Sequence, residues 1–198
     1  MYKRQISASA SESWQIKDYH YLNAKIDGAD SFQKVFKLPI KSGDELNKFL
    51  EFADEKLYGN KHSLFRWEKK ISSEIIQNNL IKNQLIADKS NLIDLQIIAR
   101  GVSGRVIKLQ INQKNDKKPI VLIKDDIRRI FSFLPSNLFT INKLNDNLWL
   151  FKGGGFGHGV GLSQSGAIEM AELGFTYEQI LNHYYQGTKI KKIEILSQ

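Results

Sequence analysis

Residues 151–190 read FKGGGFGHGVGLSQSGAIEMAELGFTYEQILNHYYQGTKI, and the first half of this stretch is dominated by glycine. Seven of the chain's 14 glycines lie between Gly153 and Gly166. Glycine lacks a Cβ and adopts positive φ angles without strain, so a run this dense indicates a backbone that passes close to another object. We expect that object to be either a neighbouring strand or a ligand.

The glycine run does not match the common nucleotide-binding or hydrolase motifs. No G-x-G-x-x-G register fits it, and no glycine pair at Walker spacing is followed by lysine. Ser163 lacks the second glycine of a nucleophile elbow, and neither His158 nor His183 has an acidic partner nearby in the sequence. Phosphate binding and serine-hydrolase chemistry are therefore not expected.

Two helices are predicted after the glycines. Ser163 can cap a helix over residues 164–173, with Gly174 as its C′ residue. Thr176 and Gln179 have the spacing of a capping box, which marks the start of a second helix. Apolar side chains at helical spacing predict the face that this second helix turns to the core: Tyr177, Ile180, Leu181, Tyr184 and Tyr185.

The remainder of the chain predicts a mixed α+β fold. Helical periodicity is found over residues 44–58 and 72–85, and Asp125-Asp126 is typical of a helix start because carboxylates are favoured in the first turn. Short runs rich in Leu, Ile and Val predict strands over residues 92–99, 105–111, 119–123 and 148–151. Residues 101–104 and 112–118 are the expected turns between them.

Composition narrows the class of protein. The 198 residues are 41% hydrophobic, which is enough for one domain with a sizeable core, and the absence of cysteine excludes disulfides and thiolate metal sites. The net charge is +8, from 29 Lys and Arg against 21 Asp and Glu. The lysines are scattered along the chain in runs of at most two and without interleaved aromatics, so we interpret them as a solvated surface and predict no nucleic-acid partner.

The glycine-rich stretch carries a family resemblance. The resemblance rests on Gly155–Gln164, Gly166-Ala167, Met170-Ala171, Gly174, Ile180–Tyr185 and Gly187-Thr188. These residues resemble the stage II sporulation protein D (SpoIID) and amidase enhancer LytB family. Weaker matches upstream are Arg100–Val106, Ile127-Arg128 and Leu134–Phe139, so that the resemblance covers residues 92–190. Residues 6–91 share only the general character of the family.

The resemblance implies one SpoIID-like domain. Residues 92–198 are then its core, with the cleft motif GHGVGLSQ, and residues 6–91 are a weakly matching helical or inserted part. Residues 1–5 resemble the translation of a sequencing adapter. We therefore expect the chain to be the truncated C-terminal part of a longer protein. The alternative is that Met1 is a true start and that the active half was lost.

Two family features have no counterpart in this sequence. Family members carry their catalytic Glu in an N-terminal Ala-Glu-Met-Pro-like segment, which is absent here, so the catalytic residue stays unassigned and this chain alone is expected to be inactive. Some relatives are expected to hold zinc with Cys and His from the segment that corresponds to Ser7–Ser13, which reads SASASES in this chain. No metal and no cofactor is predicted.

The resemblance implies that the glycine-rich segment forms one wall of a glycan cleft. The expected substrate-binding residues are Arg128, Phe156, Gly157, His158, Gly159, Ser163 and Gln164. Phe156 would offer a flat face to a sugar ring, and His158 would bond a sugar hydroxyl or orient the catalytic carboxylate. Structural alternatives stay open: His158 could hold the glycine turns, Ser163 and Gln164 could cap a helix, and Arg128 could form a plain salt bridge. His183 is expected in the core.

Two functions follow from the resemblance. The first is a lytic transglycosylase of the cell envelope, in which one Glu protonates the glycosidic oxygen between N-acetylmuramic acid and N-acetylglucosamine and then deprotonates the muramyl hydroxyl, closing an anhydro ring. The second is a non-catalytic enhancer that presents glycan strands to a partner N-acetylmuramoyl-L-alanine amidase. Both bind peptidoglycan outside the cytoplasm, and any membrane anchor or signal would come from a segment upstream.

Overall fold

The computed structural model describes residues 6–14, 16–28, 36–52, 57–88, 92–114 and 118–191. The fold is α+β, as the sequence predicts, and every named strand pairs antiparallel with its neighbours. No helix in the described ranges is long and apolar enough to cross a membrane.

Three small sheets form the β structure. One has the order β3-β8-β7 and contains β3 (Arg66–Ser72), β8 (Leu148–Gly154) and β7 (Phe139–Asn145). Another has the order β4-β5-β6 and contains β4 (Leu92–Arg100), β5 (Val106–Gln113) and β6 (Ile120–Ile123). A two-stranded sheet joins β1 (Ile6–Ser7) to β2 (Lys25–Ile26). Strand β3 belongs to the range 6–91 and β8 to the range 92–198. Their pairing therefore joins these two parts of the chain in one sheet.

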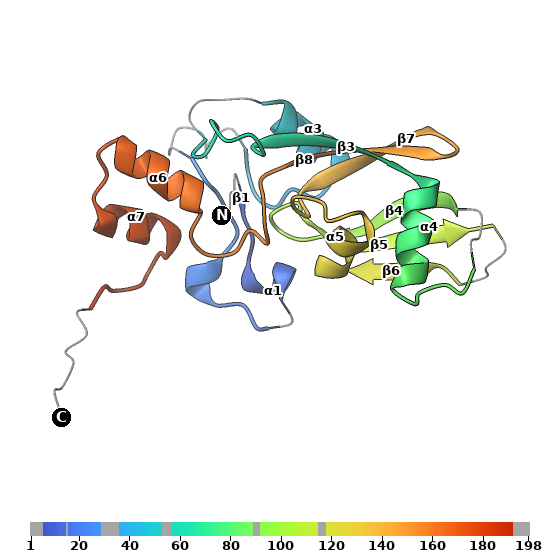
Figure 1. Ribbon diagram of the computed structural model, residues 1–198. Coiled ribbons are helices and arrows are strands. Elements are labelled where there is room, and N and C mark those ends of the chain that lie inside the picture. The colour runs from blue at the N-terminus through green and yellow to red at the C-terminus, as the bar shows by residue number, and fades with distance from the viewer. Residues whose placement is uncertain are drawn as a thin grey trace.

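The helices lie around these sheets. They are α1 (Ala10–Ser13), the 3-10 turn η1 (His20–Leu22), α3 (Gly43–Glu51), α4 (Ser73–Lys82), α5 (Asp125–Ile130), α6 (Gln164–Glu172) and α7 (Tyr177–Tyr184). Figure 1 shows α6 and α7 as a hairpin at one end of the molecule and the two three-stranded sheets with α4 at the other. The segment with α1 lies between these ends.

The main hydrophobic core lies between the two three-stranded sheets and is closed by α4 and α5. Its centre is a group of fully buried aromatic rings, Phe131, Phe139, Trp149 and Phe151. The Phe139 and Phe151 ring centroids are 5.6 Å apart. Complete burial of each such ring contributes about 1.5–3 kcal/mol to folding, so this group holds the two sheets together.

The helix signals in the sequence are confirmed at most positions. Ser163 Oγ accepts a hydrogen bond from the Gly166 amide at the start of α6, and Gly174 has φ +87° just after its end. Thr176 and Gln179 form the expected capping box of α7. Ser72 Oγ likewise accepts from the Ile75 amide at the start of α4. Helix α5 has no side-chain cap, and the two expected carboxylates occupy its first turn.

The predicted helix over residues 44–58 is wrong at Phe52, Leu57 and Tyr58, and residues 53–56 lie outside the described residues. Helix α3 begins with the capping box of Ser42 and Glu45 but ends at Glu51, and Phe52 is already extended. Leu57 forms an isolated bridge with Gly28 and is fully buried. The apolar spacing that suggested a longer helix therefore reflects burial of Leu57 against a distant segment, which local periodicity cannot distinguish from helix.

The sequence also missed four strands, the two-residue β1 and β2 as well as β3 and β7, and it shortened β8. Strands β3 and β7 were not predicted, because charged and amide side chains make up much of both, and in β7 only the first two residues are buried. Strand β8 runs on to Gly154, into the glycine run. A Cβ at Gly153 would lie 2.3 Å from the Trp67 ring. The first glycines of the run therefore serve a neighbouring strand.

Candidate functional site

The later glycines form an arc that crosses the middle of the molecule. Gly155, Gly157, Gly159 and Gly161 have φ angles of +76°, +92°, +84° and +73°, so every second residue is left-handed. At Gly159 the reason is contact, because a Cβ there would lie 2.4 Å from Nη2 of the buried Arg105. Only glycine combines this φ angle with this close approach.

The arc is held by segments that are far away in the sequence. The Ala8 amide donates to the Gly159 carbonyl at 2.8 Å, and the Gly157 amide donates to the Pro135 carbonyl at 2.8 Å. Ser13 Oγ donates to the His158 carbonyl, also at 2.8 Å. These bonds place the N-terminal segment on one side of the arc and the loop after α5 on the other.

The His158 side chain stands between these two segments. Its Nδ1 accepts a hydrogen bond from the Val160 amide at 3.0 Å, which makes Nε2 the ring's donor when the imidazole is neutral. The ring packs against Trp14, with 4.9 Å between the centroids. His158 therefore combines a backbone role, which holds the glycine turn, with an aromatic contact at the surface.

Arg128 faces the same region from α5. Its Nε donates to the Leu134 carbonyl at 2.8 Å, and its Nη1 lies 3.0 Å from Asp125 Oδ1. The Arg128 side chain is 19% exposed and that of Asp125 is 78% exposed. The guanidinium forms the salt bridge of the structural alternative and also lines a pocket, and its expected role in substrate binding stays a prediction.

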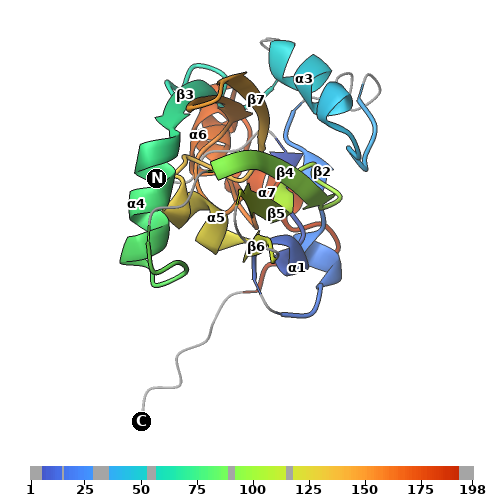
Figure 2. The same ribbon diagram turned by 90° about the vertical axis from the view of Figure 1, so that its right-hand side faces the viewer.

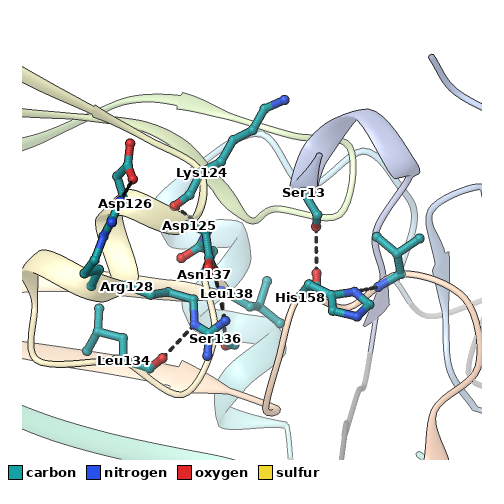
Figure 3. Close-up of polar contacts among 12 residues, drawn as sticks. Ser13, Lys124, Asp125, Asp126, Arg128, Leu134, Ser136, Asn137, Leu138 and His158 are labelled. Carbon is teal, nitrogen blue, oxygen red and sulfur yellow. Dashed lines mark hydrogen bonds and ion pairs between the residues drawn. The ribbon is translucent and has the colours of Figure 1, made fainter. Parts of the chain in front are cut away.

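The pocket at this place has a volume of about 190 Å³, and we call it the His158 pocket. It is lined by Ser13, Trp14, Asp125, Arg128, Asn137, Gly157 and His158. Figure 3 shows Asp125, Arg128 and Asn137 on one side and Ser13 with His158 on the other. Lys124 links the sides, because its Nζ donates to the Trp14 carbonyl at 2.7 Å and its own carbonyl accepts from Asn137 Nδ2 at 2.9 Å.

The pocket offers several hydrogen-bonding groups beside an aromatic ring. Asn137 Oδ1 is buried and has no hydrogen-bond partner in the described part of the chain, which is a costly state for an amide oxygen. Trp14 is 40% exposed and gives the pocket a flat apolar surface. An aromatic face with amide, hydroxyl and charged groups around it is suited to a polyhydroxylated ligand.

The structure brings three of the seven expected site residues to this pocket, namely Arg128, Gly157 and His158. The other four do not line it: Phe156 is half-buried, Gly159 packs on Arg105, Ser163 is fully buried and Gln164 is exposed at the start of α6. Ser163 is confirmed as a helix cap. A sugar-binding role for these four residues stays a prediction.

Sequence reasoning missed Ser13, Trp14, Asp125 and Asn137 as pocket residues. Ser13 and Trp14 lie more than 100 positions from His158, so only the hydrogen bonds to the arc bring them there. Asp125 was interpreted as a helix-start residue, which it also is. Asn137 lies within a stretch that carries the family resemblance, and this was the one available signal.

Glu12, next to the pocket segment, has a structural role. It is buried and accepts hydrogen bonds from the Ser103 amide at 2.9 Å and the Ser103 hydroxyl at 2.7 Å. A Cβ at Gly101 would lie 1.9 Å from its carboxylate. Glu12 thus fastens the Ser7–Ser13 segment to the turn over residues 101–104. Among the described residues, no group of three or more His, Asp or Glu side chains could hold a metal ion.

His183 lies away from this pocket. Its Nε2 is 3.0 Å from Oδ1 of Asp27, which is fully buried, and the Tyr184 hydroxyl donates to Oδ2 of the same carboxylate at 3.1 Å. The His183 side chain is only 15% exposed, which agrees with its expected core position. The acidic partner that the local sequence did not offer comes from the segment after β2 and ties it to α7.

With this geometry in place, comparison with known proteins identifies the family. A family model described as Domain of unknown function (DUF8618) matches residues 8–161. The chain belongs to this family. The matched range includes every residue that lines the His158 pocket and both three-stranded sheets, so the DUF8618 domain contains the pocket in full.

Individual relatives of this DUF8618 member extend the comparison. An uncharacterized protein of Brachyspira hyodysenteriae is 32% identical over 126 residues, which are 63% of this chain and 32% of that protein. Stage II sporulation protein D of Bacillus subtilis is 55% identical over 40 residues, 20% of this chain and 12% of that protein. The amidase enhancer of Bacillus subtilis is 42% identical over 55 residues, 28% of this chain and 8% of that protein.

These matches support a local relationship to stage II sporulation protein D and the amidase enhancer, as the resemblance suggested. The chain spans about a third or less of the length of the curated relatives that it matches. The short matches thus support a SpoIID-like relationship for part of this chain.

Proposed function

We propose that this chain binds the glycan strands of peptidoglycan at the His158 pocket, as part of a cell-wall protein outside the cytoplasm. The observation that carries the proposal is the convergence of Trp14, Asn137 and His158 from three distant segments on one pocket. An exposed indole can cover the apolar face of a sugar ring, and the surrounding polar groups can bond its hydroxyl and acetamido substituents. The names of the partial relatives, a sporulation protein and an amidase enhancer, agree with a cell-wall role.

The finer proposal is that the pocket belongs to a SpoIID-like lytic transglycosylase and holds the strand while a Glu cuts it. Only one carboxylate lines the described pocket, that of Asp125, and it is paired with Arg128. A general acid must hold a proton that it can deliver to the glycosidic oxygen. We therefore assign Asp125 to positioning Arg128 and expect the catalytic Glu to come from outside the described residues.

The same observation favours a second candidate, a non-catalytic enhancer that binds peptidoglycan and presents it to an N-acetylmuramoyl-L-alanine amidase. Such a protein needs the pocket and needs no acid in it. The two candidates share the binding step, so binding is tested first and cutting second.

The binding step is tested by titrating purified peptidoglycan glycan strands into the protein by calorimetry. We expect Trp14→Ala to weaken binding about tenfold, because a buried aromatic contact is typically worth at least 1–2 kcal/mol at a binding site. His158→Ala should also weaken binding, and by more than His183→Ala does at an equal folded fraction. Wild-type affinity in both Trp14→Ala and His158→Ala would refute the pocket assignment.

The cutting step is tested by mass spectrometry of glycan strands after incubation with the product of a complete gene that includes an upstream segment. The matched control carries Gln in place of the candidate Glu of that segment. Anhydro-muramyl ends that vanish in the control identify a lytic transglycosylase. Strands that bind but stay intact identify the enhancer, and strands that neither bind nor break contradict both.

A further inference from the structure

A larger cavity lies between the two three-stranded sheets, away from the His158 pocket. It has a volume of about 400 Å³ and is lined by Lys41, Gly43, Asp44, Asn47, Leu95, Ile97–Arg100 and Thr140–Asn142. We call it the β4–β7 groove. Figure 2 looks onto this side of the molecule, with β7 above β4 and α3 beside them.

The groove exposes the edges of two strands. Strand β4 is the outer strand of one sheet and β7 the outer strand of the other. Side chains of successive strand residues point to opposite faces, so a cavity lined by the consecutive residues 97–100 and 140–142 meets these strands edge on. An exposed edge is a template for a further strand.

The pairing of β7 with β8 shows which backbone groups of β7 point into the groove. The Leu138 carbonyl accepts from the Gly154 amide of β8, so alternate residues from 138 onward are the ones bonded to β8. The backbone groups of Phe139 and Ile141 then point away from β8. The Phe139 carbonyl indeed accepts from Arg100 Nη1, at the β4 side, at 3.0 Å. The Ile141 amide and carbonyl face the same way.

Arg100 closes one end of the groove and is a cation without a counterion among the described residues. Its Nη1 donates to the Gly104 and Phe139 carbonyls, and no carboxylate among the described residues pairs with it. Burial lowers the pKa of the Arg100 guanidinium to about 10. Lys41 adds a second positive charge to the lining, against one carboxylate, Asp44.

We propose that the β4–β7 groove binds the C-terminal end of an extended L-peptide as an added strand on β7, with its terminal carboxylate at Arg100. The direction follows from the sheet. The β3-β8-β7 sheet is antiparallel, and β7 runs away from the Arg100 end. A strand added antiparallel to β7 therefore ends at Arg100, where a carboxylate can take the remaining guanidinium donors.

The length of the site and the stereochemistry of the occupant follow from the same geometry. The edge from Phe139 to Asn142 covers four residues, or about 13 Å at 3.3 Å per residue. A regular ladder needs successive L-α-residues, so a protein C-terminus suits the edge better than a peptidoglycan stem peptide with D-centres and a γ-linkage. The inference is independent of the glycan-binding proposal.

The test uses a synthetic pool of L-hexapeptides with free C-terminal carboxylates and the same pool with C-terminal amides. Each pool is passed over the immobilised protein, and retained peptides are measured by mass spectrometry. We expect the free acids to be retained at least about tenfold more than the amides, since an amide cannot accept a charge-assisted hydrogen bond from Arg100 through a carboxylate. Equal retention, or no retention of either pool, overturns the proposal.

Variants and modified probes locate the peptide. Lys41→Gln and Arg100→Lys should weaken binding of the best free-acid peptide, and Asp44→Asn should strengthen it by removing the one opposing charge in the lining. Methylating the peptide amides one at a time should abolish binding at alternate positions only. Because Arg100 also holds two carbonyls, the Lys41 and Asp44 variants carry the test if Arg100→Lys fails to fold. Insensitivity to both variants, indifference to methylation, or stronger retention of a stem pentapeptide probe refutes the β7 assignment.

Discussion

Two arginines, Arg128 and Arg100, each face a cavity, and they differ in what the protein places beside them. Arg128 in the His158 pocket has the Asp125 carboxylate 3.0 Å away. Arg100 in the β4–β7 groove has only carbonyl partners, and no described carboxylate pairs with it. A cation with its own counterion leaves a cavity suited to a neutral ligand, while an uncompensated cation favours an anion. The difference agrees with our proposals of a sugar in one cavity and a peptide carboxylate in the other.

The two cavities also differ in construction. The His158 pocket is assembled from the N-terminal segment, α5 and the glycine arc, which are joined by single hydrogen bonds such as Ser13 Oγ to the His158 carbonyl. The groove is framed by strands that are each already paired along one side. Changes in the arc should therefore harm the pocket far more than changes at the rim of the groove harm the groove.

The largest effect is expected from Gly159→Ala. The added Cβ would meet the Arg105 guanidinium at 2.4 Å in a residue with φ +84°, so we expect a loss of about 2–4 kcal/mol in the free energy of unfolding. The matched control is Gly43→Ala at the groove, where nothing lies within 4 Å and helix α3 should gain about 0.5–1 kcal/mol. Urea unfolding of both variants measures the contrast, and equal stabilities would contradict it.

The next largest effect is expected from salt, which should weaken ligand binding at one cavity more than at the other. Raising the ionic strength from about 0.05 M to 0.5 M shortens the Debye length from roughly 14 Å to 4 Å. We expect free-acid peptides to lose affinity for the groove by about three- to tenfold, while glycan binding at the His158 pocket changes little. Calorimetry at both salt concentrations provides the comparison. A salt-sensitive glycan affinity would mean that the pair of Arg128 and Asp125 does not neutralise the pocket.

Asp125→Asn should make the His158 pocket resemble the β4–β7 groove in charge, with an arginine that lacks a carboxylate partner. The change leaves Arg128 without its carboxylate, so we expect N-acetylmuramic acid, which carries a free carboxylate, to gain about two- to fivefold in affinity over N-acetylglucosamine. The effect is modest because the Asp125 side chain is 78% exposed, and exposed pairs are worth at most about 1 kcal/mol. Competition against bound glycan strands measures the ratio, and an unchanged ratio would argue that the counterion does not set ligand charge.

The smallest effect concerns pH and the segment that presents Trp14. Hydrogen bonds from the Ser11 amide and then the Ser11 hydroxyl lower the pKa of Asp18 below its usual 3.8. The contribution of this carboxylate is present above pH 3.8 and is lost as the pH falls through the lower folded-state pKa. Asp18→Asn should speed amide exchange at Ser11 at pH 7 and leave the groove unchanged. Unaltered exchange would show that Asp18 does not hold this segment.

Much of the fold could be predicted from local signals. The caps at Ser72, Ser163 and Thr176 and the β-rich runs gave α4, α6, α7 and β4–β6 nearly in place, because caps and alternation act within a few residues. The end of α3 and the strands β3 and β7 could not be obtained this way. Their state depends on partners such as Gly28 and β8, which are far away in the chain.

The residues of the candidate site also fall into two groups, those with a local sequence signal and those placed by contacts between distant segments. The glycine arc and His158 were found in the sequence because glycine density and a long motif are local features, and Arg128 was found through the family resemblance. Trp14 and Asn137 were not, since their place at the pocket depends on hydrogen bonds across long stretches of chain, such as Ser13 Oγ to the His158 carbonyl.

The sequence by itself determined the α+β class, the helix starts and the position of the glycine arc, because backbone preferences of Gly, Ser and Thr operate over a few residues. Only the tertiary structure decided that Asp125 compensates Arg128 while no described carboxylate compensates Arg100. Counterions are a matter of distances between side chains, and the fold sets these distances. The charge of the ligand that each cavity favours is therefore a property of the folded chain.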